Sequence, residues 1–314
     1  MPGRPRGPKG STPSNAPGAT LGHPSDDTFK MIEYKSRIRK YKDTYIDPAF
    51  FETYRTKTPL DMVLSEDGGL LKAFIYMLTA DAGCGKSTVV LDLLANLLRV
   101  NPDLRILFIS AEMTKYQLAK YMKRFPKCEE IDILYVKARD NGDDWTATVA
   151  ILSEGYDVVA SDSIAEMENV ISKEVGVSTK EAEKLFLSEI MKHSEGTNDR
   201  RALTSFILVQ QVTKSGDFLG ANRLQHVVDG SIVLRSEGES RFSPRYLMFK
   251  KHRGGTPHER LYYDLTQGGD ILYDGERLER ERKLQQLQAD DARSIRNAAD
   301  SFTSFSFNQD IDEQ

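Results

Sequence analysis

The stretch TADAGCGKST, residues 79–88, constrains the fold of this chain more than any other, because it joins two apolar runs through small residues. The run before it, residues 73–78, is short and continuously apolar, which is typical of a strand buried on both faces. Residues 87–100, which follow, have the spacing of an amphipathic helix. A buried strand that leads through a glycine-containing turn into a helix predicts a sheet with crossover helices.

The same alternation of strand and helix continues through the centre of the chain. Short apolar runs predict five buried strands, at residues 72–78, 105–110, 132–136, 157–163 and 204–211. Helical spacing is found between them, at residues 87–100, 114–125 and 143–155. Four further runs predict consecutive strands, at residues 230–237, 245–253, 260–266 and 270–274. This order predicts an α/β fold with a mostly parallel twisted sheet flanked by helices and with antiparallel strands added at the C-terminal side.

Both ends of the chain differ from this centre. Residues 1–28 are rich in proline, glycine and serine, and we expect them to be disordered because they offer little apolar surface to bury. Residues 29–56 are basic and aromatic, and we predict a helix over residues 29–42 in an arm that packs on the core or a neighbouring subunit, or contacts nucleic acid. Residues 57–274 form the predicted core. Residues 275–314 predict a polar helix and a mobile acidic and aromatic tail, which is either solvated, or docked on a replication or recombination protein, or in competition with nucleic acid for a basic groove.

Composition excludes several classes of protein. The two cysteines, Cys84 and Cys128, are too few for a disulfide framework or a four-cysteine zinc site. No apolar stretch approaches the roughly 18–20 residues that span a bilayer, and the first residues lack the apolar core of a secretory signal. We therefore expect a cytoplasmic protein without a membrane partner. Because the net charge is −4, any contact with nucleic acid depends on local basic loops.

The turn itself nearly matches the phosphate-binding pattern G-x-x-x-x-G-K-[ST], with Ala80 at the first glycine position. Gly83 and Gly85 allow backbone N–H groups to turn toward phosphate oxygens, and the positive end of the following helix faces the same point. Lys86 is predicted to reach the β- and γ-phosphates of ATP, and the Ser87 hydroxyl to ligate Mg²⁺. The predicted nucleotide-binding residues are Ala80, Asp81, Ala82, Gly83, Cys84, Gly85, Lys86, Ser87 and Thr88. The alternative is a ligand-free turn of small residues, and we expect Ala80 to alter the loop geometry or weaken affinity.

Polar residues at the ends of three other predicted strands complete a site for ATP hydrolysis. Asp162 ends an apolar strand, as does the carboxylate that supports Mg²⁺ in phosphate-loop enzymes. Glu112 follows another strand and is predicted to orient and activate the attacking water. Gln211 ends a third, where its amide is placed to sense the γ-phosphate. The alternatives are a turn residue, an acid at a helix N-terminus and a surface amide, respectively.

At these residues the chain resembles the RecA-like ATPase superfamily, most closely the RadA/Sms branch and next the DnaB-type helicases. GCGKST, SDSI and SAEM are similar to the strand-end motifs of these proteins, and the long stretch that begins VQQVTKSGDFLG is similar to the RadA segment containing the DNA-facing loop. The resemblance covers residues 57–274. The chain departs from RadA because it lacks the cysteines for a zinc module and the length for a Lon-protease-like domain. It also departs in the motif KKHRGG, where His252 replaces Asn and Gly254 replaces Phe.

The resemblance implies a RecA-like core that assembles as a ring, expected to be a hexamer, or as a filament, with ATP between subunits. Lys251 and Arg253 are then expected to reach the γ-phosphate held by the next subunit, where a guanidinium matches the phosphate oxygens. The loop with Lys214 and Arg223 is expected to bind single-stranded DNA in the central channel. The alternatives are a basic pair on a strand and a glycine-rich surface turn. A second basic segment, residues 165–202, is a weaker candidate for the DNA contact, with Lys173, Lys180, Arg200 and Arg201.

Together these features predict a Mg²⁺-dependent, DNA-stimulated ATPase that moves on single-stranded DNA, including the activity of a DNA helicase, in replication, recombination or repair in a bacterial or phage-infected cell. One alternative within the superfamily is a strand-exchange or annealing recombinase. Another is a KaiC-like regulatory ATPase that acts without nucleic acid.

Overall fold

A computed structural model describes residues 38–81, 83–137, 142–211, 223–238, 240, 242–266, 268 and 270–309. The predicted disordered residues 1–28, most of the predicted helix 29–42, Ala82, Lys214 and the acidic residues 310–314 lie outside these ranges. The chain forms two compact units, residues 1–47 and residues 48–314.

The predicted N-terminal helix is wrong where the structure describes it. Lys40 is extended, with φ −72° and ψ 140°, and only the 3₁₀ turn η1, Tyr41–Asp43, follows it. A second 3₁₀ turn, η2, Pro48–Phe51, leads to the short strand β1, Thr53–Tyr54, which pairs antiparallel with β2, Leu70–Leu71. A short helix gains most of its stability from burying an apolar face, and residues 38–45 are all exposed. The basic and aromatic pattern therefore does not produce a helix there.

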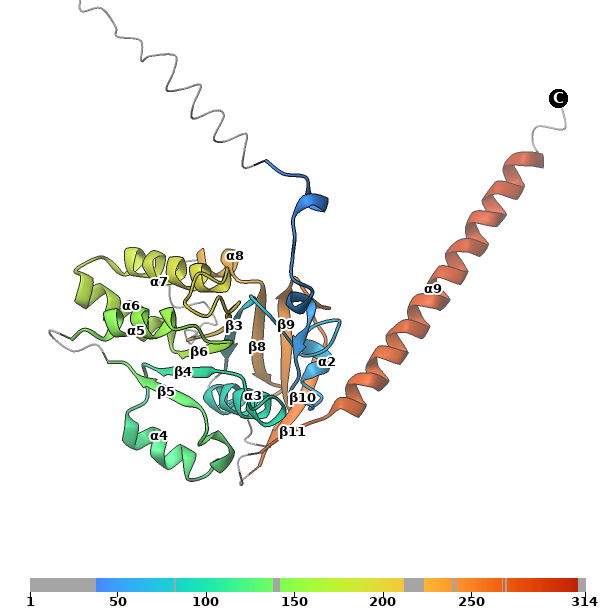
Figure 1. Ribbon diagram of the computed structural model, residues 1–314. Helices are drawn as coiled ribbons and strands as arrows, with labels where there is room; N and C mark the ends of the chain where they lie inside the picture. The colour runs from blue at the N-terminus through green and yellow to red at the C-terminus, as the bar shows by residue number, and fades with distance from the viewer. Residues whose placement is uncertain are drawn as a thin grey trace, which may run out of the picture. The chain divides into compact units, whose positions relative to one another are not determined.

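Nine strands form one sheet in the order β11-β10-β9-β8-β3-β7-β6-β4-β5 (Figure 1). The first five along the chain match the predicted strands: β3 Ile75–Ala80, β4 Ile106–Ser110, β5 Asp132–Tyr135, β6 Val158–Asp162 and β7 Ser205–Gln210. They are followed by β8 Gly230–Ser236, β9 Arg245–His252, β10 Arg260–Leu265 and β11 Ile271–Tyr273. β8 pairs parallel with β3 and antiparallel with β9, so the antiparallel part begins at β9. The predicted α/β sheet with antiparallel strands at its C-terminal side is confirmed.

Helices cover both faces of the parallel part of the sheet (Figure 1). The α-helices are α2 Asp61–Leu64, α3 Lys86–Val100, α4 Lys115–Met122, α5 Asp144–Ser153, α6 Ile164–Val175, α7 Thr179–Ser194, α8 Arg223–Val227 and α9 Gly275–Gln309, and η3 Pro126–Cys128 is a 3₁₀ turn. Successive strand residues point to opposite faces, so Leu78 packs in the cluster with α3 and Met77 in the cluster with α6 and α7. The strands β3, β4, β6 and β7 are buried along almost their whole length, which is why they were recognisable as short apolar runs in the sequence, whereas the edge strand β5 is only partly buried.

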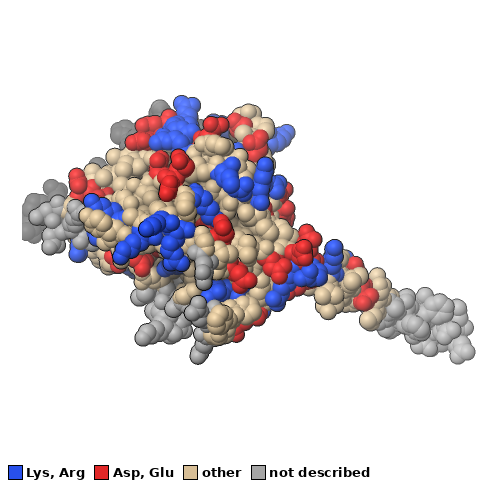
Figure 2. All heavy atoms as spheres, turned by 90° about the horizontal axis from the view of Figure 1, so that it is seen from below, with Lys and Arg blue, Asp and Glu red and all other residues tan. Residues whose placement is uncertain are grey.

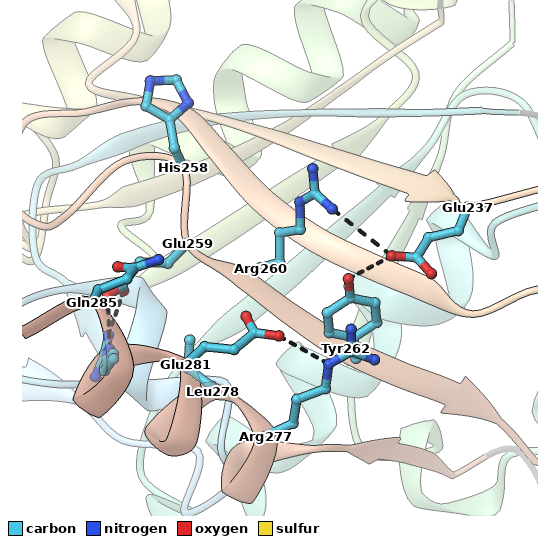
Figure 3. A pocket seen from close by; sticks show the side chains of 10 residues that line it. Glu237, His258, Glu259, Arg260, Tyr262, Arg277, Leu278, Glu281 and Gln285 are labelled. Carbon is cyan, nitrogen blue, oxygen red and sulfur yellow. Dashed lines mark hydrogen bonds and ion pairs between the residues drawn. The ribbon is translucent and has the colours of Figure 1, made fainter. Parts of the chain in front are cut away.

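The last helix, α9, extends through the phenylalanine-containing segment to Gln309, further than its polar residues alone predicted. Its first turns are attached to the core beside a cavity of about 440 Å³ (Figure 3). Arg277 lies over the Tyr262 ring, with 3.3 Å from guanidinium carbon to centroid. Arg282 pairs with Glu259 and donates to the Met62 carbonyl at 2.8 Å. Arg277 and Arg282, two of the charged residues that line this cavity, thus attach α9 to β10 and to the residues beside it.

Among the described residues, no helix is both long and apolar enough to cross a membrane.

Candidate functional site

The glycine-containing turn links the end of β3 to the start of α3. Its first residue is tied to the sheet, because the Asp81 N–H donates to the Leu234 carbonyl at 3.1 Å. Gly83 and Gly85 both have φ of +80°, in the left-handed region that glycine adopts without strain. Gly85 caps α3 at its N-terminus, so the free N–H groups of the first helical turn face the loop. This arrangement is suited to holding an anion such as the phosphates of a nucleotide.

Strand β10 packs against this loop, which the sequence did not predict. The Tyr263 hydroxyl donates to the Cys84 carbonyl at 2.8 Å, and Cys84 is buried. A Cβ atom at Gly85 would lie 2.7 Å from Leu265 Cδ1, so the close approach of β10 also requires glycine there. A carbonyl held toward β10 does not face the anion, whose oxygens it would repel. The sequence around Cys84 does not indicate these contacts, because Tyr263 lies 179 residues after Cys84.

We expect Tyr263→Phe to raise the KM for ATP by about 5-fold with a smaller change in kcat, because a hydrogen bond worth roughly 1 kcal/mol no longer orients the loop carbonyl. Tyr262→Phe is the matched control, since this neighbouring hydroxyl points to Glu237 and not to the loop. ATPase kinetics and thermal midpoints of both variants provide the test. Equal KM values in the two variants would contradict a role for Tyr263 in the loop.

The side chains of Ser87 and Asp162 meet at the end of the loop. Ser87 Oγ donates to Asp162 Oδ2 at 2.6 Å, and Asp162 is only 1% exposed. Burial raises the pKa of Asp162, whereas the hydrogen bond from Ser87 and the charge of Lys86 lower it and the charge of Glu112 raises it. The other oxygen, Asp162 Oδ1, is buried and has no hydrogen-bond partner among the residues that the structure describes. A hydroxyl and a carboxylate with one uncommitted oxygen fit Mg²⁺, which takes oxygen ligands and usually only one or two carboxylates.

In the described ranges, no group of three or more histidine, cysteine, aspartate or glutamate side chains could hold a metal ion.

Glu112 and Gln211 lie at the same edge of the sheet. The N–H groups of Ala111 and Glu112 donate to the Asp162 carbonyl at 2.9 and 3.1 Å, so the end of β4 turns toward the end of β6. Gln211 Nε2 donates to Glu112 Oε2 at 3.3 Å. Neighbouring parallel strands end at one edge, and for this reason Glu112, Asp162 and Gln211 gather beside the loop although 99 residues separate the first from the last.

The helix α4 also contacts the loop region. The Tyr121 hydroxyl donates to the Thr88 hydroxyl, next to Ser87, and burial raises the pKa of Tyr121 to about 12. The N-cap of α4 is Thr114, two residues after Glu112, with a full capping box to Gln117. Thr88 was predicted only as a loop residue, and its partner was not predicted.

Lys251 and Arg253 lie at the opposite edge of the sheet. His252 pairs with Gly230, which pairs with Tyr76 at the start of β3, whereas the loop follows the end of β3. Four to five residues of strand correspond to about 15 Å. Lys251 Nζ donates to the carbonyls of residues 225, 226 and 228, at 3.1, 3.2 and 2.6 Å. Arg253 pairs with Asp229 at 2.7 Å and keeps 56% of its side chain exposed. Neither residue joins the loop of its own chain.

The predicted DNA-binding residues are described only in part. Lys214 lies outside the described residues, and Arg223 begins α8 but its side chain is not described. Of the weaker candidates, Lys173 is exposed on α6 and Lys180 is exposed on α7. Arg200 forms an ion pair with Asp157 at 3.5 Å.

Comparison with known proteins agrees with this geometry. The profile of the family described as "ATPase: KaiC" matches residues 54–273. The DNA repair protein RadA of Pseudomonas aeruginosa is 32% identical over 68% of this chain and 43% of its own length, and RadA of Mycolicibacterium smegmatis is 31% identical over 72% and 46%. The chain therefore spans less than half the length of these curated relatives.

A solved structure shares the fold. The KaiC-like protein PH0186 of Pyrococcus horikoshii superposes with a TM-score of 0.53 over 71% of this chain and 99% of its own, at 17% sequence identity. The expected RecA-like superfamily is confirmed, with RadA among the relatives. The match over residues 54–273 establishes that this chain belongs to the KaiC family of RecA-like ATPases.

Proposed function

We propose that this protein is a Mg²⁺-dependent ATPase that acts on single-stranded DNA in repair, recombination or replication, as a ring, expected to be a hexamer, or as a filament. The observation that carries the proposal is the meeting of Ser87, Asp162, Glu112 and Gln211 beside the loop of Lys86. These are the groups that hydrolysis of a phosphoanhydride requires. The RadA relatives, named as DNA repair proteins, support DNA as the partner.

In this proposal each residue has a separate task. The N–H groups of the loop and Lys86 bind the phosphates. Ser87 and Asp162 hold Mg²⁺, which when bound neutralises phosphate charge. Glu112 orients the attacking water and accepts its proton, and Gln211, through its hydrogen bond to Glu112, links the site to the chain that follows β7.

The positions of Lys251 and Arg253 support hydrolysis between subunits. Because they lie about 15 Å along the sheet from the loop of their own chain, they are suited to contact only a nucleotide held by a neighbour. Of the two, Arg253 is the more available to a neighbouring subunit, because 56% of its side chain is exposed. Lys251 instead donates to three carbonyls of one segment of its own chain.

A second function is favoured by one observation, the match to the KaiC family profile. It is a regulatory ATPase that acts on proteins without nucleic acid. A strand-exchange or annealing recombinase remains the alternative within the DNA-directed group, and unwinding of a tailed duplex separates it from a helicase.

We expect ATP hydrolysis by the purified protein to rise at least about 5-fold with a single-stranded deoxythymidine oligomer, and the stimulation to fall as salt increases because phosphate contacts release counterions. Steady-state hydrolysis with and without the oligomer, at several salt concentrations, provides the measurement. Hydrolysis that the oligomer leaves unchanged, together with no binding at low salt, would favour the regulatory ATPase.

A further inference from the structure

The outer face of α4 carries a concentration of positive charge that the proposed site does not use. Lys120, Lys123 and Arg124 are exposed, and Tyr116 beside them keeps 72% of its surface exposed. Lys120 is four residues after Tyr116 and three and four residues before Lys123 and Arg124, spacings that place side chains next to one another on a helix surface. Lys123 is the C-cap of α4, and Arg124 follows it. The opposite face is buried through Leu118. Figure 2 shows lysine and arginine side chains gathered on the face seen from below, the side on which α4 lies in Figure 1.

The sequence segment that contains this surface has no acidic residue of its own. Residues 114–128 contain five lysines and arginines and no aspartate or glutamate, in a chain with a net charge of −4. Lys127 pairs with Asp92 and Asp270. Within the described residues, Lys120, Lys123 and Arg124 make no ion pair, and like charges at these spacings cost a helix about 0.2–0.5 kcal/mol per pair. An unbalanced cluster of this kind indicates a polyanionic ligand.

The exposed tyrosine distinguishes between polyanions. An aromatic ring among cations offers a stacking surface for a base while the cations meet the phosphates. Lys115 already lies 5.1 Å from the Tyr116 ring centroid, which leaves the cation and the ring side by side at the surface. An acidic protein segment would gain only apolar contact from this ring, whereas a base would stack on it. Single-stranded nucleic acid is therefore the better match.

The inner face of α4 connects this surface to the ATP site. Tyr121 contacts Thr88 beside Ser87, and the N-cap of the helix, Thr114, lies two residues after Glu112. A ligand that changes the position or mobility of α4 therefore affects the proposed ATP site at two points, Thr88 and Glu112. Tyr116, Lys120 and Tyr121 lie on this eight-residue helix, and Lys123 and Arg124 follow directly at its C-terminal end.

We propose that Tyr116, Lys120, Lys123 and Arg124 form a contact surface for single-stranded nucleic acid on α4, separate from the loop with Lys214 and Arg223. The inference rests on the proposed function and adds a second contact for the same strand. Occupancy of this surface reaches the ATP site through Tyr121 and the segment that leads from Glu112 into α4.

The test is binding of a fluorescent deoxythymidine oligomer to the full chain and to Lys120→Gln/Lys123→Gln/Arg124→Gln. We expect at least about 10-fold weaker binding at low salt, and a slope of log K against log salt that is smaller by about 2, since each single-strand phosphate contact contributes about 0.7. Tyr116→Ala is expected to weaken binding by at least about 5-fold with an unchanged salt slope. Removing like charges relieves repulsion in α4, so an unchanged thermal midpoint is expected.

The matched control is Lys283→Gln/Arg293→Gln/Arg296→Gln, which removes three exposed charges from α9 and leaves the net charge equal to that of the α4 variant. The control should bind as the unmodified chain does. Equal affinity of the α4 variant and the unmodified chain overturns this inference alone. If the unmodified chain itself does not bind the oligomer, the proposed function is overturned and the inference with it.

Discussion

Replacement of Lys86 by alanine is expected to reduce ATP hydrolysis by at least about 100-fold, the effect typical of losing one group that stabilises developing charge at a reacting centre. Lys86 is the first residue of α3, directly after the left-handed Gly85, and its charge acts on Asp162 across the site. The amine is the only side-chain cation that the loop residues 79–88 contain. In the proposed site, loss of this cation removes the direct partner of the β- and γ-phosphates.

The fold should remain, because no ion pair of Lys86 stabilises the described structure. Hydrolysis, binding of a fluorescent ATP analogue and the thermal midpoint measure the three properties separately. Lys283→Ala, on the exposed part of α9, is the control for removal of one lysine and should hydrolyse ATP as the unmodified chain does. A Lys86→Ala protein that keeps hydrolysis within about 3-fold would show that the loop is not the phosphate site.

The second large effect concerns Glu112. We expect Glu112→Gln to lower kcat by about 100- to 10,000-fold, the usual contribution of a positioned general base, while nucleotide affinity is kept or increased. Glutamine has the same shape and preserves an oxygen for the hydrogen bond from Gln211. It removes the negative charge that raises the pKa of Asp162 and that repels a triphosphate. Binding and hydrolysis should therefore separate in this variant.

Single-turnover hydrolysis and equilibrium binding of the nucleotide test this separation. Glu130→Gln, an exposed carboxylate beyond η3, is the matched control and should change kcat by less than about 2-fold. A Glu112→Gln protein that hydrolyses ATP normally would assign the base to another group. A protein that no longer binds nucleotide would instead assign Glu112 to the structure of the site.

Much of the proposed ATP site was predictable because it depends on local order. The strand, the two glycines and the helix that form the loop are adjacent in the sequence, and the backbone at Gly83 and Gly85 has the positive φ that glycine favours. Asp162 and Glu112 were predictable because parallel strands end at one edge, so residues that follow buried runs come together. The roles given to these residues stay proposals, while the strand ends that place them are observed.

The N-terminal arm shows the limit of local patterns. Its basic and aromatic residues were predicted to form a helix over residues 29–42, but residues 38–45 are exposed and contain only the 3₁₀ turn Tyr41–Asp43. Helical spacing stabilises a helix when an apolar face is buried, and no such burial occurs for these residues. Conversely, α9 continues to Gln309 through residues that the sequence assigned to a mobile tail.

The nucleotide loop, the buried strands and their chemistry at one edge follow from short stretches of sequence, because dihedral preferences and burial patterns act over neighbouring residues. The support of the loop by Tyr263 and Leu265, the contact of Tyr121 with Thr88, and the placement of Lys251 and Arg253 at the far edge depend on strands and helices that are distant in sequence. The support of the loop and the placement of Lys251 and Arg253 exist only after β8, β9 and β10 have joined the sheet in their particular register, and the contact of Tyr121 exists only after α4 has packed beside α3. No local preference specifies that register or that packing.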